Sequence, residues 1–181
     1  PFQARAAQAI VDGKNVLVAA PTGAGKTLVA DVAIAEARAE GRRVVYTSPI
    51  KALSNQKFRD FRAAYGDDAV GIMTGDVTIE GEAPLLIMTT EIFRNTIFES
   101  PERLAAVDFV VFDEVHYLDD LERGTVWEES ILYAPPHVRI MRSELVVEVP
   151  PASDHELLAE AELFGTADGI VADSFLDLEL E

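Results

Sequence analysis

Short apolar runs alternate along the chain with longer segments of helical periodicity. The runs are rich in valine, isoleucine and leucine and end at polar or turn residues, which is typical of strands buried on both faces. The expected strands cover residues 15–20, 44–47, 70–73, 85–89, 108–113 and 138–141, and the expected helices cover residues 3–12, 26–40, 51–65, 91–99 and 126–133. This alternation predicts a three-layer α/β fold, in which a mostly parallel sheet is covered by helices on both faces.

Length and composition narrow the class of protein. With 181 residues, of which 49% are hydrophobic, the chain is long enough to bury the core of one domain. No apolar run approaches the roughly 18 residues that a membrane span requires, so no membrane contact is expected. The opening residues Pro1-Phe2-Gln3 are neither a start methionine nor a signal sequence, which predicts a piece of a longer, cytoplasmic protein. The absence of cysteine excludes disulfides and thiolate zinc sites.

The net charge of −17 is unevenly distributed. Residues 1–142 hold 21 acidic and all 15 basic residues, a balance of −6, whereas residues 143–181 hold 11 acidic residues and no basic ones. Proteins that bind nucleic acid usually present a basic surface, and the mildly acidic body leaves such binding to local geometry. We therefore predict a domain over residues 1–142 and a separate acidic segment over residues 143–181.

A glycine-rich segment, Ala20-Pro-Thr-Gly-Ala-Gly-Lys-Thr27, lies between an expected strand and an expected helix. Glycine lets backbone N–H groups turn toward phosphate oxygens, and the following helix directs its positive dipole end at the same anion. Lys26 is expected to reach the β and γ phosphates, and the Thr27 hydroxyl to bind Mg²⁺. The residues predicted to surround the nucleotide phosphates are Pro21, Thr22, Gly23, Ala24, Gly25, Lys26 and Thr27. The alternative is an ordinary glycine-rich turn with an exposed lysine.

Two acidic residues, Asp113 and Glu114, follow the apolar strand at residues 108–112. Ligands of parallel sheets bind at the carboxyl ends of the strands, so Asp113 is placed to hold Mg²⁺ and Glu114 to deprotonate an attacking water. The alternative is a strand that ends in solvated acids. His116 taken alone is an ordinary histidine. We expect the loop at 20–27 and the acids at 113–114 to lie at neighbouring strand ends and to share one Mg²⁺–ATP.

Together, the segments 20–27 and Asp113-Glu-Val-His116 resemble the DExH-box helicases of superfamily 2. Four further segments are similar to the Ski-like branch, the RNA helicases associated with exosome-type RNA decay and their bacterial relatives; these are residues 47–57, 74–76, 89–95 and 122–129. The resemblance covers about residues 1–141 in the order of the family. It implies a RecA-like P-loop NTPase fold and ATP hydrolysis coupled to 3′-to-5′ movement on RNA.

The resemblance also implies roles for individual residues. Phe2 and Gln3 match the segment that reads adenine, and His116 matches the residue that couples the nucleotide site to the nucleic-acid site. The positions that match contacts to the nucleic-acid backbone are Ser48, Pro49, Lys51, Gly75, Asp76, Thr89, Thr90 and Glu91. For Ser48 and Thr90, the alternative is that each side chain caps the helix that follows. Trp127 is expected to be buried and structural.

The resemblance ends after Ile140, where the family continues into a Ser-Ala-Thr motif that this chain lacks. The second RecA-like lobe and its arginine fingers, which contribute on the order of 10³–10⁵ in rate, are also absent. We expect this chain to bind ATP and to hydrolyse it slowly. Three alternatives remain: a DNA helicase lobe, a binding module without turnover, and a small-molecule kinase, the last of which leaves residues 47–57 and 89–95 unexplained.

The segment at 143–181 is patterned as a short helix over residues 153–164 and a half-buried strand over residues 176–180. It is compatible with a fusion, a frame-shifted end or a divergent edge of the domain.

Overall fold

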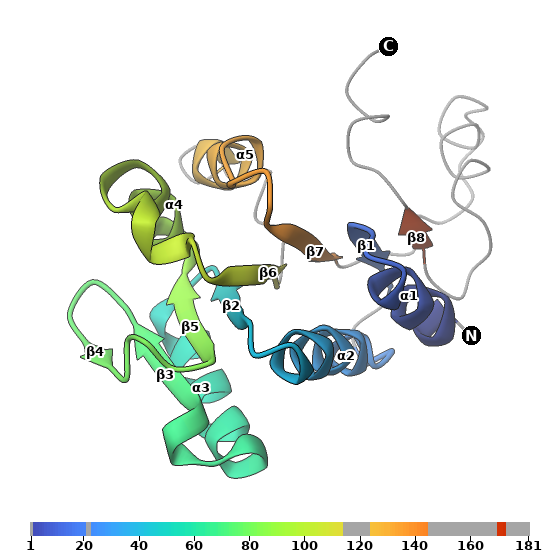
Figure 1. Cartoon of the computed structure of the whole chain (residues 1–181), viewed down its shortest axis with the longest axis horizontal. Coiled ribbons are helices and arrows are strands. Elements are labelled where there is room, and N and C mark those ends of the chain that lie inside the picture. The colour runs from blue at the N-terminus through green and yellow to red at the C-terminus, as the bar shows by residue number, and fades with distance from the viewer. Residues whose placement is uncertain (1, 21–22, 114–123, 145–169, 173–181) are drawn as a thin grey trace.

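The computed structural model describes residues 2–20, 23–113, 124–144 and 170–172, which form one mixed sheet covered by helices (Figure 1). The strands are β1 (Val16–Ala19), β2 (Arg43–Ser48), β3 (Val70–Met73), β4 (Thr78–Ile79), β5 (Leu85–Thr89), β6 (Val107–Phe112), β7 (Arg139–Glu144) and β8 (Ile170–Ala172). Their order across the sheet is β4-β3-β5-β2-β6-β7-β1-β8. Strands β3, β5, β2, β6, β7 and β1 run parallel, and β4 and β8 add an antiparallel strand at either side.

Helices cover both faces of this sheet, which confirms the predicted three layers (Figure 1). The helices are α1 (Phe2–Val11), α2 (Lys26–Ala39), α3 (Lys51–Tyr65), α4 (Thr90–Glu99) and α5 (Gly124–Leu132), with 3₁₀ turns η1 (Asp67–Ala69) and η2 (Pro101–Leu104). Helices α1, α2 and α3 pack on one face, and α4 and α5 pack on the other. Among the described residues, none of the helices has the length and apolar character needed to cross a membrane.

The central strands are apolar along their whole length because both of their faces are buried. In β2, Val44 and Tyr46 join the core under α1–α3, whereas Val45 joins the core under α4 and α5. On that second face Trp127 is 1% exposed, as predicted, and its ring packs against Phe112 with 5.5 Å between the ring centroids. Burial on both sides removes the polar alternation that would mark a half-exposed strand.

Several elements differ from the sequence-based expectation. Strand β4 was not predicted, because its two residues are exposed and form a strand only by pairing with Ile72 and Met73. Strand β8 pairs antiparallel with β1, and β7 extends three residues further than expected, to Glu144, because its pairing with β1 continues to Ala19. The predicted boundary at residue 142 therefore lies inside a strand, and the division of the chain stays a prediction. The helix expected at 153–164 and the strand expected at 176–180 lie outside the described residues.

Candidate functional site

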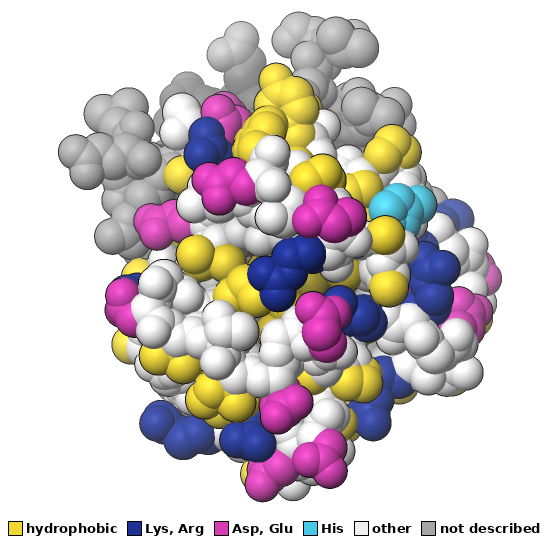
Figure 2. Space-filling model, turned by 60° about the vertical axis from the view of Figure 1, so that its left-hand side comes forward, with side chains coloured by type: hydrophobic (Ala, Val, Ile, Leu, Met, Phe, Trp, Pro, Cys, Tyr) yellow, Lys and Arg dark blue, Asp and Glu magenta, His cyan; other side chains and the backbone are white. Residues whose placement is uncertain are grey.

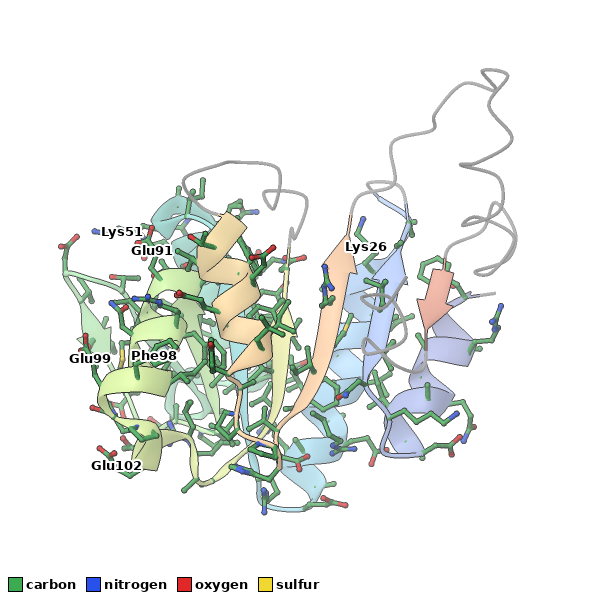
Figure 3. All side chains as sticks on the ribbon, turned by 90° about the horizontal axis from the view of Figure 1, so that it is seen from above. Lys26, Lys51, Glu91, Phe98, Glu99 and Glu102 are labelled. Atoms are coloured by element: carbon green, nitrogen blue, oxygen red, sulfur yellow. The ribbon has the colours of Figure 1, made fainter. Side chains whose placement is uncertain are left out.

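Apart from Phe2 and Gln3, which lie in α1, the segments with predicted chemistry lie at the carboxyl ends of parallel strands, so they meet at one edge of the sheet. The loops after β3, β5 and β2 begin with Thr74, Thr90 and Pro49, and we call this part of the edge the nucleic-acid half. Asp113 follows β6 and the glycine-rich loop follows β1, and we call this part the nucleotide half. Figure 3 shows Lys26 near one end of this edge and Lys51 and Glu91 near the other.

Asp113 and the glycine-rich loop do not follow neighbouring strands, which corrects the sequence-based expectation. Strand β7 lies between β6 and β1, and it pairs Arg142 with both Phe112 and Leu17. Since adjacent strands are about 4.8 Å apart, the backbones of β6 and β1 are separated by about 10 Å. Asp113 comes one residue after this common level and Ala20 three residues after it. The two segments therefore lie on the same edge of the sheet, on either side of β7.

The glycine-rich loop has a backbone that only glycine adopts without strain. Gly23 and Gly25 have φ angles of 80° and 88°, in the left-handed region. Gly25 is the N-cap of α2, and no side chain accepts a hydrogen bond from the first N–H groups of this helix. A helix N-terminus without a side-chain cap keeps its backbone donors available to an anion.

Side chains from α1 and α2 close around this loop. The Gln3 side-chain amide donates a hydrogen bond to the Ala24 carbonyl oxygen at 2.8 Å, and the Lys26 ammonium donates to the Ala20 carbonyl oxygen at 2.6 Å. Phe2 is 6% exposed and belongs to the core. Gln3 therefore holds the loop itself in this structure, which puts α1 in direct contact with the glycine-rich loop.

Asp113 is held by groups from β2 and α3. The Tyr46 hydroxyl donates a hydrogen bond to Oδ2 of Asp113 at 2.5 Å, and the Lys57 ammonium lies 3.6 Å from the same oxygen. The Asp113 backbone N–H donates to the carbonyl oxygen of Thr47 at 3.1 Å. The Asp113 side chain is 15% exposed, so the carboxylate is fixed in direction but still reachable from solvent.

These residues fit a magnesium-bound nucleotide. Magnesium in such sites is held by one or two protein oxygens together with the substrate phosphates. Across the described residues, no group of three or more His, Cys, Asp or Glu side chains could hold a metal ion. The left-handed glycines and the uncapped start of α2 would supply the phosphate donors, and Asp113 would supply the carboxylate.

The nucleic-acid half contains both exposed and buried side chains. Lys51, Gly75, Asp76 and Glu91 are exposed and Pro49 is half-buried. The side chains that are buried belong to Ser48, Thr89 and Thr90, which are 1%, 5% and 3% exposed. In this conformation these three residues are almost inaccessible to a ligand.

The capping alternative for Ser48 and Thr90 is wrong. The N-caps of α3 and α4 are Ile50 and Thr89, and neither helix has a side-chain cap bond. The Ser48 hydroxyl instead shares a hydrogen bond of 2.6 Å with the Ser54 hydroxyl. The Thr90 hydroxyl donates to the Ser48 carbonyl oxygen at 3.5 Å. The first bond joins the end of β2 to α3, and the second joins it to the start of α4.

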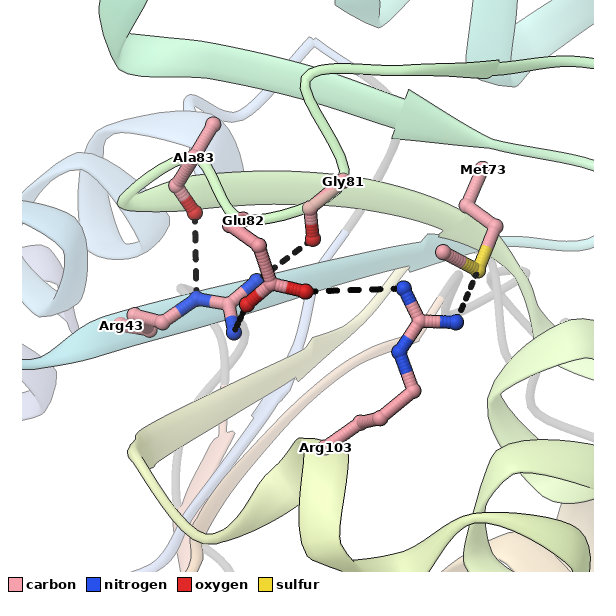
Figure 4. Close-up of polar contacts among 6 residues, drawn as sticks. All are labelled: Arg43, Met73, Gly81, Glu82, Ala83 and Arg103. Carbon is pink, nitrogen blue, oxygen red and sulfur yellow. Dashed lines mark hydrogen bonds and ion pairs between the residues drawn. The ribbon is translucent and has the colours of Figure 1, made fainter.

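The loop that carries Gly75 and Asp76 is anchored at its far end, over the start of β2 (Figure 4). The Arg43 guanidinium donates to the carbonyl oxygens of Gly81 and Ala83 and pairs with Glu82 at 2.9 Å. At β3, a Cβ on Gly71 would overlap the backbone of Glu80, so the hairpin packs directly on the strand. Near its tip, Asp76 forms an ion pair with Lys51.

Surface charge does not mark this region as basic. On the face shown in Figure 2, Lys and Arg side chains are interspersed with Asp and Glu side chains and do not form one basic surface. Within the nucleic-acid half, Lys51 and Asp76 form an ion pair, so each charge offsets the other. Contacts to a nucleic-acid backbone would therefore depend on loop geometry rather than on a general positive potential.

Two residues at the site were missed by the sequence analysis, Tyr46 and Lys57. Lys57 ends a segment that was matched to the family without a role, and Tyr46 lies in an apolar strand. A buried tyrosine needs a partner for its hydroxyl, which is the signal that points to a polar group nearby. Glu114, His116, Pro21 and Thr22 lie outside the described residues, and their roles stay predictions.

Comparison with known families agrees with this geometry. The sequence model for the family described as DEAD/DEAH box helicase matches residues 1–143. Among curated proteins, the DExH-box ATP-dependent RNA helicase DExH9 of Arabidopsis thaliana is 53% identical over 140 residues, covering 77% of this chain and 14% of the relative. The antiviral helicase SKI2 of Saccharomyces cerevisiae is 51% identical over 140 residues, covering 77% of this chain and 11% of the relative.

Solved structures share the fold. The helicase Lhr of Mycobacterium smegmatis, bound to single-stranded DNA and AMP-PNP, superposes with a TM-score of 0.60 at 29% identity, covering 82% of this chain and 23% of Lhr. The DUF1998 helicase MrfA, bound to DNA and AMPPNP, superposes with a TM-score of 0.63 at 18% identity, covering 83% of this chain and 24% of MrfA. The chain spans well under a quarter of the length of the curated relatives it matches.

Proposed function

Because the chain belongs to the DEAD/DEAH box helicase family, we propose that it is the ATP-binding lobe of an ATP-dependent RNA helicase. The observation that carries this proposal is the common sheet edge on which the glycine-rich loop and Asp113 lie, one strand apart. RNA is favoured over DNA because relatives about 50% identical, such as DExH9, are named as RNA helicases. In the complete protein, ATP hydrolysis would drive movement along RNA together with a second RecA-like lobe.

The roles of the residues follow from their positions at this edge. Lys26, at the start of α2, is proposed to bind the β and γ phosphates, and Thr27 and Asp113 to bind magnesium. Glu114 is proposed as the base for the attacking water and His116 as the link to the nucleic-acid half. Magnesium bound with ATP would neutralise charge that develops on the phosphates.

The isolated chain is proposed to bind nucleotide far better than it hydrolyses it. Positioning and charge stabilisation account for most of the rate in phosphoryl transfer, and arginine residues from a second lobe supply a large part of both. Binding is therefore the direct test of this lobe.

Calorimetric titration of the chain with ATP, with and without magnesium, tests the nucleotide site. Binding that depends on magnesium, and that Lys26→Met and Asp113→Asn each weaken, is the expected result. The two variants separate the phosphate contact from the metal contact, because only Asp113→Asn should leave magnesium-free binding unchanged. Absence of magnesium-dependent binding in the parent chain would refute the proposal.

Turnover and the choice of nucleic acid need separate measurements. Steady-state phosphate release should rise when RNA is added, and Glu114→Gln should remove that rise while nucleotide binding persists. If Glu114→Gln releases phosphate at the parent rate, the chain is a binding module and Glu114 is not the base. Competition between RNA and DNA strands of matched sequence then decides between an RNA helicase and a DNA helicase lobe.

A further inference from the structure

The carboxylate of Asp113 already has a cation beside it, the ammonium of Lys57. Nζ of Lys57 lies 3.6 Å from Oδ2 of Asp113, the oxygen that also accepts the Tyr46 hydroxyl bond. The two side chains are only 22% and 15% exposed, so this pair is screened less than a surface ion pair. Any second cation that binds Asp113 must share its negative charge with Lys57.

Lys57 is held in place by more than the ion pair. Its ammonium lies over the ring of Tyr46, 5.3 Å from the centroid, a distance at which an aromatic face attracts a cation. The Tyr46 ring is itself fixed by an edge contact with Phe61, which lies in α3 together with Lys57; the two ring centroids are 5.1 Å apart. The ring therefore attracts the ammonium in the same position in which it pairs with Asp113.

Helix α3 connects this cation to the nucleic-acid half. Lys57 lies six residues after Lys51, the first residue of α3, so their backbones are about 9 Å apart along a rigid helix. Lys51 is exposed at the end of β2 and pairs with Asp76. The helix that presents one lysine to the nucleic-acid half therefore presents another to the carboxylate of the nucleotide half.

We propose that Lys57 is a positioning residue that occupies the cation position beside Asp113 and is displaced when a magnesium-bound nucleotide takes that carboxylate. This inference rests on the proposed function, since it assumes that Asp113 binds magnesium. A lysine ammonium is a single charge on a flexible stem, whereas magnesium is divalent and binds carboxylate oxygens at about 2.1 Å. Magnesium therefore displaces the Lys57 ammonium from Asp113, but its apparent affinity is lowered because the ammonium must first leave.

The proposal predicts that Lys57 raises the magnesium concentration needed for nucleotide binding. Lys57→Met keeps the length of the side chain and removes the charge, so the concentration of magnesium that half-saturates nucleotide binding should fall by about 3- to 10-fold. Lys57→Arg keeps the charge and should restore a value close to that of the parent chain. A purely structural ion pair would instead leave Asp113 less well placed in Lys57→Met and would raise the magnesium requirement.

The experiment is a titration of the 181-residue chain with a fluorescent ADP analogue at a series of magnesium concentrations. Arg59→Met is the matched control, because Arg59 is exposed on the same helix and its loss changes the net charge equally. Lys57→Gln is a second neutral variant in case Lys57→Met does not fold, as judged by thermal unfolding. The inference would be overturned if Arg59→Met lowered the magnesium concentration for half-saturation as much as the neutral Lys57 variants do. A general effect of net charge would then explain both shifts.

Failure of this inference differs from failure of the proposed function. If the parent chain binds nucleotide without any dependence on magnesium, the proposed metal role of Asp113 is wrong. In another case, nucleotide binding by the parent chain depends on magnesium, but the neutral Lys57 variants need the same magnesium concentration for half-saturation or a higher one. Only the role of Lys57 is then wrong.

Discussion

The two halves of the sheet edge differ in what holds their loops in place. In the nucleic-acid half, Lys51 pairs with Asp76, and the Ser48 hydroxyl pairs with that of Ser54. In the nucleotide half, the first turn of α2 has no side-chain cap. The glycine-rich loop depends on the left-handed backbone of Gly23 and Gly25 and on hydrogen bonds from Gln3 and Lys26 to its carbonyl oxygens. The nucleic-acid half is thus held by bonds between side chains, whereas the nucleotide half depends on the backbone conformation of its glycines.

Gly71→Ala is expected to break the nucleic-acid half with the largest effect. A Cβ at this position would overlap the Glu80 backbone, which cannot move without displacing the hairpin that carries Asp76. Overpacking of this kind costs about 3 kcal/mol of unfolding free energy, measurable by urea denaturation. RNA affinity should fall, whereas magnesium-dependent nucleotide binding of the folded fraction should stay at the parent value.

Gly81→Ala is the control for this change. It lies in the same hairpin, but the nearest atoms to its Cβ belong to flexible side chains of Thr78 and Arg103, at 3.2 and 3.4 Å. A loss of stability in Gly81→Ala as large as that in Gly71→Ala would contradict the role given to the backbone contact.

Gly25→Ala is expected to break the nucleotide half alone. Its φ angle of 88° is strained for alanine by about 1–2 kcal/mol, and the added Cβ would lie 3.3 Å from Nε2 of Gln3. Relaxation of the loop toward an unstrained backbone turns its donors away from the phosphates. We expect nucleotide binding, measured by calorimetry, to weaken about 10-fold, a change of about 1.4 kcal/mol, while RNA affinity is unchanged.

Gly13→Ala provides the comparison for that variant. Gly13 has a φ angle of 80° in the turn between α1 and β1, and a Cβ there meets nothing within 4 Å. It should lose a similar amount of stability without any loss of nucleotide affinity. Equal loss of nucleotide affinity in both variants would mean that backbone strain acts through global stability and not through the loop.

Much of the core was predictable from sequence, because continuous apolar runs report burial on both faces. The boundaries of α3, β3 and β5 were predicted to the residue, and Asp113 was predicted at a strand end. Each of these features depends on a local pattern of apolar and turn residues. The shared edge of the glycine-rich loop and Asp113 follows from parallel strands alone.

Features that depend on contacts between distant segments were not predictable. The order of strands, which puts β7 between β6 and β1, is set by packing of the whole sheet. The burial of Ser48 and Thr90 depends on the neighbouring strand β5 and on α3. Lys57 contacts Asp113 across 56 positions of sequence, and no local signal distinguishes it from any other helical lysine.

Removal of either charge in the Lys51–Asp76 pair tests the nucleic-acid half by itself and should have a smaller effect on stability than the glycine substitutions. Both side chains are more than half exposed, so the pair should contribute less than about 0.5 kcal/mol to stability. Lys51→Ala should lower RNA affinity and reduce the slope of log affinity against log salt by about one unit. Asp76→Asn should raise RNA affinity, because it removes a carboxylate beside the bound phosphates. Fluorescence anisotropy at several salt concentrations measures both, and an unchanged slope in Lys51→Ala would mean that Lys51 makes no phosphate contact.

The smallest effect expected is a pH dependence at the contact between α2 and α3, the helices that follow the two halves. The Tyr65 hydroxyl donates to Oδ1 of Asp31 at 2.8 Å, and burial together with this bond raises the pKa of Tyr65 from 10.0 to about 12. Because the folded pKa is above the unfolded one, the stabilisation is complete below pH 10 and is lost as the pH rises toward 12. The difference in unfolding free energy between the parent chain and Tyr65→Phe should therefore shrink over that interval in urea titrations.

Tyr133→Phe, which removes an exposed hydroxyl that bonds to no described side chain, is the control. A parent-to-Tyr65→Phe difference that stays constant up to pH 12 would show that Tyr65 contributes its ring to this helix contact and that its bond to Asp31 does not favour the neutral hydroxyl.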